Sequence, residues 1–234
     1  MPVKPTTQFV ILGAGGDALV VAEAVRQAAE AGQPVSLAGY LDDTLAGTEM
    51  DGLPVFGTLD EWATLDTAIR FIPAIQKVRD MPRRATRLEE LSIPLARWAQ
   101  IIHPRAVVAR NVRIGAGVYI AACATVQPGC IIGDFATLRG GAALGHDATV
   151  ENHGYVGPNA TLCGKTIVCE GAHLGPNAVV LDSKQVGRFS VVGIGSAVTK
   201  DVAEFTVVMG NPARRIGRVK GFGRYMPKAL NPEI

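Results

Sequence analysis

The chain has 234 residues, of which 48% are hydrophobic, and a formal net charge of +2. This length suffices for one large hydrophobic core or two modest ones, and the near-neutral charge, without a long block of like charges, argues against nucleic-acid binding. Apolar runs stay shorter than the roughly 18 residues of a membrane span, and the first residues do not follow the pattern of a signal peptide. We therefore expect a cytoplasmic protein without a membrane partner.

The beginning of the chain predicts a strand, a tight turn and a helix. Residues 9–12 are an apolar strand, the turn "GAGGDA" follows, and an amphipathic pattern predicts a helix over residues 17–31. In such a turn the N–H groups at the helix N-terminus point at an anion. Gly13, Gly15 and Ala18 also fit the dinucleotide-binding pattern G-x-G-x-x-G/A.

A second predicted strand, "VSLAGYLDD", ends at Asp42 and Asp43, roughly where a ribose-binding acid lies in a dinucleotide-binding fold. Only about 100 residues precede the next type of pattern, so the second half of a dinucleotide-binding fold is missing. We predict a small Rossmann-like domain over residues 1–100 that binds one nucleotide or nucleotide sugar. A nicotinamide-dependent dehydrogenase fits the turn but lacks space for its second half.

The second half of the chain carries a repeat of six residues. An aliphatic residue recurs at every sixth position, and the residue two places before it is mostly small. The aliphatic positions are Val108, Ile114, Ile120, Val126, Ile132, Leu138, Leu144, Val150, Val156, Leu162, Val168, Leu174, Val180, Val186, Val192 and Val198. This pattern is typical of a hexapeptide-repeat solenoid.

The period also predicts the shape of the solenoid. One inward aliphatic side chain from each of three sides fills a triangular bore, so 18 residues form one coil and the sixteen hexads form a little over five coils. Glycine often follows the aliphatic residue, as at Gly145 and Gly175, which we interpret as a turn that needs a positive φ. Handedness does not follow from the pattern.

The stacking of coils places a histidine at a bend. His146 follows the inward Leu144 by two positions and Asp147 comes next, with Gly164 one coil above His146. Two interpretations remain open from geometry alone. His146 is an exposed corner residue beside an Asp147–Lys165 surface pair, or it is a general base whose tautomer Asp147 holds.

The combination of "GAGGDA", "GYLDD", "IIHPRAVV", "GHD", "LCG" and "GNPARRI" resembles the bacterial sugar O/N-acyltransferases, which include nucleotide-amino-sugar N-acetyltransferases and sialic acid O-acetyltransferases. The resemblance covers essentially the whole chain. It implies a left-handed β-helix over residues 101–234, including a C-terminal tail, and a homotrimer. It also implies acetyl-coenzyme A as the acyl-donor substrate in the groove between neighbouring solenoids, without a metal.

The resemblance also assigns roles to residues. It makes His146 the general base and Asp147 the carboxylate that raises the basicity of His146. The coenzyme-binding positions of the family fall at Tyr155, Gly164, Pro176 and Ile194. For the acceptor, we expect Gly15, Gly16, Asp42 and Asp43 to hold the nucleotide end of the substrate, and Asp17 to contact the sugar or its amine.

Three positions depart from the family pattern. Tyr155 stands where family members usually have a second histidine, with His153 two positions out of register and His173 one coil above Tyr155. Asp17 replaces a histidine that touches substrate. "PAIQ", residues 73–76, replaces a motif usually found beside the nucleotide. These changes concern mainly the acceptor side.

The leading hypothesis is therefore an acetyl-coenzyme A-dependent N-acetyltransferase for a nucleotide-linked amino sugar. An O-acetyltransferase for a free sugar such as a sialic acid is the enzymatic alternative, and a non-catalytic solenoid scaffold is the other. Outward alanines such as Ala121, Ala122 and Ala143 are too apolar for a free surface, which predicts association into a homotrimer with parallel solenoid axes.

Overall fold

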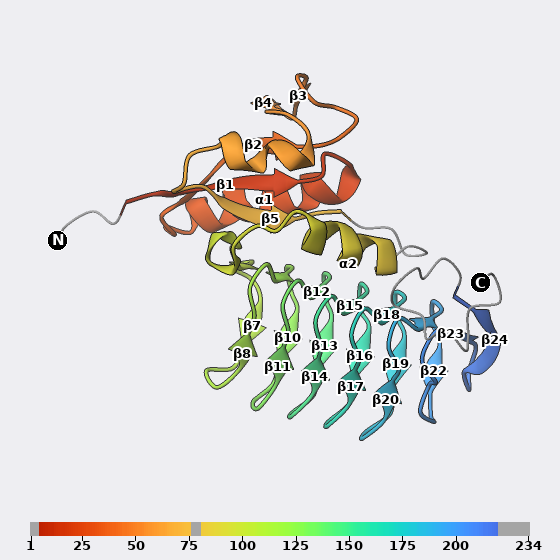
Figure 1. Cartoon of the computed structure of the whole chain (residues 1–234). Coiled ribbons are helices and arrows are strands. Elements are labelled where there is room, and N and C mark those ends of the chain that lie inside the picture. The colour runs from red at the N-terminus through yellow and green to blue at the C-terminus, as the bar shows by residue number, and fades with distance from the viewer. Residues whose placement is uncertain (1–4, 76–80, 220–234) are drawn as a thin grey trace, which may run out of the picture.

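The computed structural model describes residues 5–75 and 81–219, so residue 76 of the "PAIQ" motif and the tail from residue 220 lie outside it. An α/β part lies along one side of a β-solenoid (Figure 1). Neither α-helix of the described part has the length and apolar content of a membrane span. All four cysteines are free.

The α/β part is built on a three-stranded parallel sheet. Its order is β2-β1-β5, with β1 (Thr7–Leu12) between β2 (Val35–Leu41) and β5 (Arg70–Pro73). Strand β1 leads through the glycine-rich turn into α1 (Gly16–Glu30), as the sequence predicts. The other elements of this part are β3 (Glu49–Met50), β4 (Leu53–Pro54), η1 (Leu59–Thr64), α2 (Met81–Glu90) and η2 (Leu95–Arg97).

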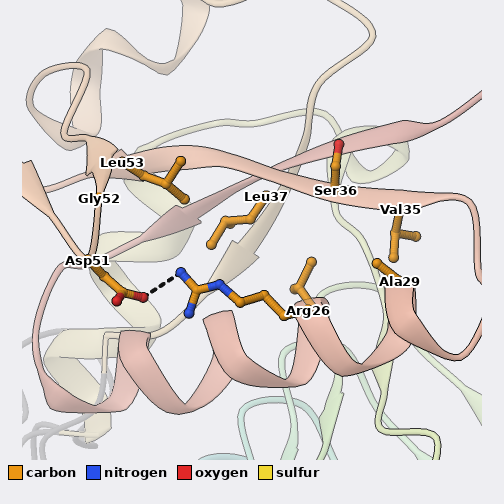
Figure 2. Close-up of a pocket in the computed structure, with 9 residues that line it drawn as sticks. Arg26, Ala29, Val35, Ser36, Leu37, Asp51, Gly52 and Leu53 are labelled. Atoms are coloured by element: carbon orange, nitrogen blue, oxygen red, sulfur yellow. Dashed lines mark hydrogen bonds and ion pairs between the residues drawn. The ribbon is translucent and has the colours of Figure 1, made fainter.

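On the outer side of this part, the β3-β4 hairpin is tied to α1. Arg26 of α1 forms an ion pair with Asp51 in the hairpin turn, and both line a hollow of about 330 Å³ together with apolar residues such as Leu37 and Leu53 (Figure 2). None of the candidate functional residues lines this hollow, so we assign it a structural role.

The solenoid has three faces, each a parallel sheet of short strands. The first face contains β7 (Val107–Val108), β10 (Thr125–Val126), β13 (Ala143–Leu144), β16 (Thr161–Leu162), β19 (Val179–Val180) and β22 (Ala197–Val198). The second face contains β8 (Arg113–Ile114), β11 (Ile131–Ile132), β14 (Thr149–Val150), β17 (Ile167–Val168) and β20 (Gln185–Val186).

The third face begins before the sequence repeat and ends after it. It contains β6 (Ile101–Ile102), β9 (Tyr119–Ile120), β12 (Thr137–Leu138), β15 (Tyr155–Val156), β18 (His173–Leu174), β21 (Val191–Val192), β23 (Thr206–Met209) and the antiparallel β24 (Arg214–Arg218). The solenoid is therefore longer than the hexads from 108 to 198 predict, because β6 and β23 lie outside that run.

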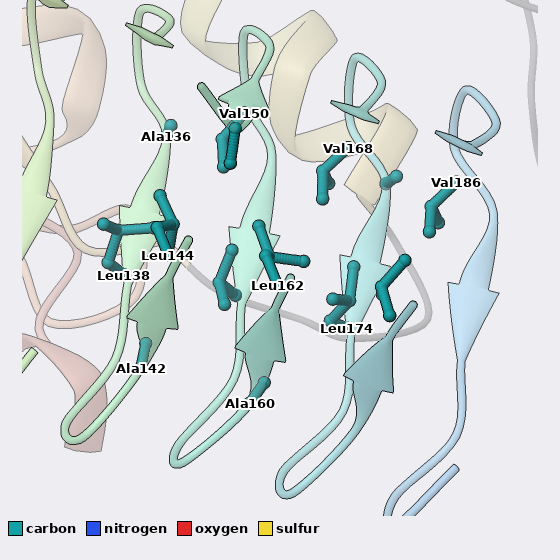
Figure 3. Packing of buried hydrophobic residues seen from close by; sticks show 14 of the residues in the cluster. Ala136, Leu138, Ala142, Leu144, Val150, Ala160, Leu162, Val168, Leu174 and Val186 are labelled. Carbon is teal, nitrogen blue, oxygen red and sulfur yellow. The ribbon is translucent and has the colours of Figure 1, made fainter. Parts of the chain in front are cut away.

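The predicted inward column forms the core of the solenoid. Every aliphatic residue of the column from Ile120 to Val198 is at most 3% exposed, and Figure 3 shows Leu138, Leu144 and Leu162 among those that meet in the bore. Strand pairs join residues 18 apart, such as Ala143 with Thr161. The period of six residues and the coil of 18 residues are confirmed.

The glycine after the aliphatic residue has a different cause from the one expected. Gly145 is not among the residues with positive φ, but a Cβ atom there would lie 2.7 Å from the backbone nitrogen of Gly164 in the next coil. The left-handed conformation falls two residues later, where Asp147 has a φ of 59°. Glycine is required at the corner because the coils approach too closely for a side chain.

The third face carries the α/β part. Ala121 is only 4% exposed because it packs with Ile101 and Tyr119 against residues of α1, such as Ala24. The expectation that Ala121 faces a neighbouring subunit is therefore wrong. Apolar side chains remain exposed elsewhere, on the first face at Val107 and Val179 and on α1 at Leu19 and Val20.

Candidate active site

The His146–Asp147 pair lies at the corner between the first and second faces, which we call the His146 corner. The bend between β13 and β14 leaves the two side chains 54% and 58% exposed, and His146 Nδ1 lies 2.9 Å from Asp147 Oδ2. The His146 backbone N–H donates to Gln127 Oε1 at 3.0 Å. The carboxylate contact places the proton of a neutral imidazole on Nδ1 and leaves Nε2 as an acceptor. In the described part of the chain, Asp147 pairs with His146 and forms no ion pair with Lys165.

Gly164 lies against the imidazole, one coil above it. A Cβ atom at Gly164 would be 2.6 Å from His146 Nε2, so only glycine leaves room for the ring in this position. Within the described residues, the Gly164 backbone N–H has no hydrogen-bond acceptor, whereas the N–H of Lys165 donates to the His146 carbonyl. A free N–H group beside a candidate base is an arrangement that can stabilise a developing oxyanion.

The other expected coenzyme positions lie elsewhere on the solenoid. Pro176 and Ile194 lie in successive coils at the corner between the third and first faces, which we call the Pro176 corner. The Gly195 N–H donates to the Pro176 carbonyl. Ile194 is 68% exposed. Tyr155 belongs to the third face, which is the side of the triangle opposite the His146 corner. One chain therefore brings Gly164 to His146, and keeps Tyr155, Pro176 and Ile194 away from it.

His153 and His173 are buried and unsuited to accept a proton from a ligand. Burial, with the nearby charge of Arg84, lowers the pKa of His153 to about 3, and burial lowers the pKa of His173 to about 4. The His173 ring stacks on Tyr155 with 4.3 Å between the ring centroids, and His173 Nδ1 is buried without a hydrogen-bond partner among the described residues. Both histidines stay neutral in the physiological range, and their side chains serve packing.

The glycine-rich turn leaves open backbone at the start of α1. A Cβ atom added at Gly15 or Gly16 would meet no atom within 4 Å, and Gly15 caps α1 without a side chain. Asp17 follows in the first turn, and its Oδ1 lies 2.8 Å from Arg139 Nη1 of the solenoid. The sequence analysis missed Arg139, because the pair is 122 residues apart along the chain and only the fold joins it.

The carboxylates of Asp42 and Asp43, which follow β2, form hydrogen bonds and an ion pair within the protein. Asp42 Oδ2 accepts a hydrogen bond from the Ala14 N–H in the glycine-rich turn at 2.8 Å, and Asp42 Oδ1 accepts from Thr44 and Leu45. Burial works against ionisation of Asp42, but these hydrogen bonds outweigh it and keep its pKa below the usual value. Asp43 Oδ1 accepts from the Leu59 N–H, and its Oδ2 lies 3.5 Å from Arg87.

A cleft of about 680 Å³ opens beside these acids. Gly13, Asp42 and Asp43 lie on one wall, and Arg84 and Arg87 of α2 lie on the other. Arg84 is 3% exposed and reaches from the cleft to the solenoid, where its Nη2 donates to the Phe135 carbonyl at 3.1 Å. Burial lowers the pKa of Arg84 to about 10, so it stays charged. The α2 wall carries three arginines and Glu90, and Arg87 is paired with Asp60 and Asp43. The net positive charge of this wall suits an anionic ligand such as a nucleotide. In the described part there is no cluster of three side chains able to hold a metal.

No family model matches the chain. Among solved structures, a variant of perosamine N-acetyltransferase from Caulobacter crescentus, in complex with CoA and GDP-perosamine, has 29% identity and a TM-score of 0.79, over 90% of this chain and 97% of that one. The structure of PerB from the same organism, also with CoA and GDP-perosamine, has 30% identity and a TM-score of 0.77 over the same shares. The chain belongs to this family of left-handed β-helix sugar acetyltransferases.

A curated relative of the sugar acetyltransferases agrees with this assignment over a shorter stretch. The chain is 41% identical over 59 residues to the dTDP-3-amino-3,6-dideoxy-alpha-D-galactopyranose 3-N-acetyltransferase of Aneurinibacillus thermoaerophilus. This match spans 25% of the chain and 29% of the relative. This match supports the assignment of the chain to the sugar acetyltransferases. It is too short to identify the substrate of this chain.

The hydrogen bonds of Asp42 predict a measurable pH dependence of stability. Because the native pKa of Asp42 lies below its unfolded value, the carboxylate stabilises the fold above about pH 4, and this contribution is lost as the pH falls through the native pKa. We expect Asp42→Asn to lower the free energy of unfolding at pH 7, and to make it vary less between about pH 5 and pH 3 than in the unaltered protein.

Chemical denaturation at a series of pH values measures this effect. Glu30→Gln, at an exposed position at the end of α1, is the control and should leave the slope unchanged. An Asp42→Asn protein with the same slope as the unaltered protein would contradict the role given to these hydrogen bonds.

Proposed function

We propose that the protein transfers the acetyl group of acetyl-coenzyme A to the amine of a nucleotide-linked amino sugar, with His146 as general base. The observation that carries the proposal is the His146–Asp147 contact of 2.9 Å beside Gly164, in a chain that aligns along 97% of a structure containing CoA and GDP-perosamine. The related proteins act on or bind amino sugars linked to GDP or dTDP, which supports the same substrate class.

The proposed chemistry needs a proton acceptor and a hydrogen-bond donor. As the acceptor amine attacks the thioester carbon, His146 Nε2 takes a proton from the nitrogen, and it returns this proton to the sulfur that leaves when the C–S bond breaks. Asp147 holds the imidazole in the required tautomer and stabilises its protonated form. The Gly164 N–H is a suitable donor to the carbonyl oxygen as negative charge develops on it.

The substrate ends are assigned to two further places. The cleft beside the α/β sheet takes the nucleotide, with the open backbone of Gly15 and Gly16, the structurally braced Asp42 and Asp43, and the positive wall on α2. The Gly-rich strand-turn-helix beside this cleft is the basis for describing residues 1–100 as a Rossmann-like domain. We assign coenzyme contacts to Tyr155, Gly164, Pro176 and Ile194.

We further propose that the working enzyme is a homotrimer whose active sites lie between copies. Within one chain the His146 corner is opposite the third face, which carries Tyr155 and the Asp17–Arg139 pair. A second copy can bring its own His146 corner to the Pro176 corner of the first copy. An apolar groove of about 480 Å³ lies between α1 and Ala122, Gly140 and Pro158, which occupy the same edge of the solenoid in earlier coils. It supports such a contact, since Leu19 and Val20 that line it are more than 40% exposed.

An acetyl-transfer assay over a panel of acceptors tests the proposed substrate class. The panel contains GDP-perosamine, dTDP-3-amino-3,6-dideoxygalactose, the matching free amino sugars and free sialic acids. We expect transfer to a nucleotide-linked amine, and a much lower kcat/KM for the same sugar without its nucleotide. Transfer to the free sialic acids alone would replace the proposal with an O-acetyltransferase, and no transfer from acetyl-coenzyme A to any acceptor would leave the scaffold alternative.

Replacement of the proposed base has a defined effect. We expect His146→Ala to lower kcat by about two to four orders of magnitude, because the amine then loses its proton acceptor. Affinity for coenzyme A, measured by calorimetry, should stay within a few-fold. Asp147→Asn should cost less, since the neutral amide still contacts the ring.

The control is Arg113→Gln, because Arg113 is exposed on β8 of the second face and does not line the groove beside α1. This control should retain kcat. Near-normal turnover of His146→Ala would remove His146 from the mechanism.

A further inference from the structure

An ion pair joins the start of α1 to the solenoid beside the proposed acceptor site. Asp17 lies in the first turn of α1, directly after the open backbone of Gly15 and Gly16, and Arg139 follows strand β12 of the third face. Arg139 Nη1 lies 2.8 Å from Asp17 Oδ1. The Arg139 side chain is 14% exposed and that of Asp17 is 35% exposed. The pair is thus covered on the arginine side and open on the aspartate side.

The aromatic neighbours of the pair are neutral. Tyr119 and Tyr155 are close enough to feel both charges, and burial raises the pKa of each phenol, with Arg139 acting against this and Asp17 adding to it. His173, stacked on Tyr155, is neutral because burial lowers its pKa to about 4. Among the described residues, Asp17 and Arg139 are the charged groups that act on both phenols, with opposite signs, and Glu23 of α1 lines the groove beside Arg139.

A carboxylate beside an acceptor amine has two opposing effects. It accepts a hydrogen bond that orients the nitrogen, but a lone negative charge within about 4–6 Å also raises the pKa of the amine by about 1–3 units. An ammonium has no free electron pair and cannot attack the thioester. A carboxylate whose charge is cancelled by a fixed cation keeps the orienting hydrogen bond and loses most of the effect on the pKa.

We propose that Arg139 is a positioning residue that acts through Asp17. Arg139 holds Asp17 Oδ1, so that Oδ2 accepts a hydrogen bond from the substrate amine, and it cancels the charge that would otherwise keep the amine protonated. This inference rests on the proposed function, since it requires an amine acceptor. It makes the Asp17–Arg139 pair, rather than Asp17 alone, the feature that adapts this chain to an uncharged amine nucleophile.

The proposal makes opposite predictions for the two partners of the pair. Asp17→Asn leaves the Arg139 charge uncancelled and should lower the pKa of the bound amine by about one unit. Arg139→Met leaves the Asp17 charge uncancelled and should raise this pKa by about one unit. Arg139→Lys keeps the charge, and the double variant Asp17→Asn/Arg139→Met removes both charges, so both should stay near the parent value.

The bound amine can be titrated by NMR in a protein that cannot turn over. The parent is the His146→Asn variant, which also removes the imidazole, saturated with coenzyme A. The probe is GDP-perosamine, or dTDP-3-amino-3,6-dideoxygalactose where the transfer assay selects it, labelled with ¹³C at the amine-bearing carbon. The chemical shift of this carbon against pH gives the pKa of the bound amine in each variant.

Opposite shifts in the two single variants support the proposal, whereas unchanged values, or shifts of the same sign, overturn it. A merely structural ion pair would weaken binding in both variants without moving the amine pKa in opposite directions. If Arg139→Met does not fold, Asp17→Asn alone decides, because an unchanged or raised pKa in that variant overturns the proposal. Failure of the unaltered protein to transfer acetyl to any amine rejects the proposed function itself, and this inference with it.

Discussion

The stacking of inward aliphatic side chains every six residues is the constraint on which the rest of the structure depends. The chain returns to the same corner after each coil of 18 residues. Residues far apart in the sequence therefore become neighbours, and residues close in the sequence are separated. His146 and Gly164 are brought into contact in this way. His146 and Tyr155, only nine residues apart, are placed on opposite sides of the triangle. The geometry of the repeat therefore decides which candidate groups one chain can combine.

The α/β part is fixed to the third face by polar contacts as well as apolar packing. Asp17 contacts Arg139, Gln27 contacts His103, and the buried Arg84 joins the carbonyl of Ile75, at the cleft, to the carbonyl of Phe135. These contacts lie along the length of the helices that cover the face. Because a buried guanidinium without hydrogen-bond partners is costly, Arg84 also restricts how the cleft can move relative to the solenoid.

Much of the solenoid could be predicted from the sequence because its rule is local and repeated. The inward column, the coil length and the exposed position of His146 and Asp147 all follow from the period of six. The reason for Gly145 could not be predicted, since the clash that excludes a side chain comes from the next coil. The burial of Ala121 escaped prediction for the same reason, because α1 covers it from a distant part of the chain.

The candidate site was less predictable on the proposed acceptor side. Asp42 follows a strand, as expected, but its oxygen atoms are occupied by Ala14, Thr44 and Leu45, which sequence spacing does not reveal. Arg139 has no motif around it, and its importance depends on the position of Asp17 in three dimensions. Long-range polar pairs of this kind carry no local pattern, so they appear only once the two parts of the fold are placed together.

The central claim is that each active site combines the His146 corner of one copy with the acceptor groups of another, and subunit mixing tests it most directly. His146→Ala removes the base, and Gly16→Trp fills the space beside the turn, where a Cβ atom meets nothing within 4 Å. Each variant alone should be inactive. After unfolding, mixing in equal amounts and refolding together, random cyclic trimers should recover about one quarter of the activity of the unaltered protein treated in the same way. No recovery, from a mixture shown by mass spectrometry to contain hybrid trimers, would mean that the site lies within one chain and would contradict this account.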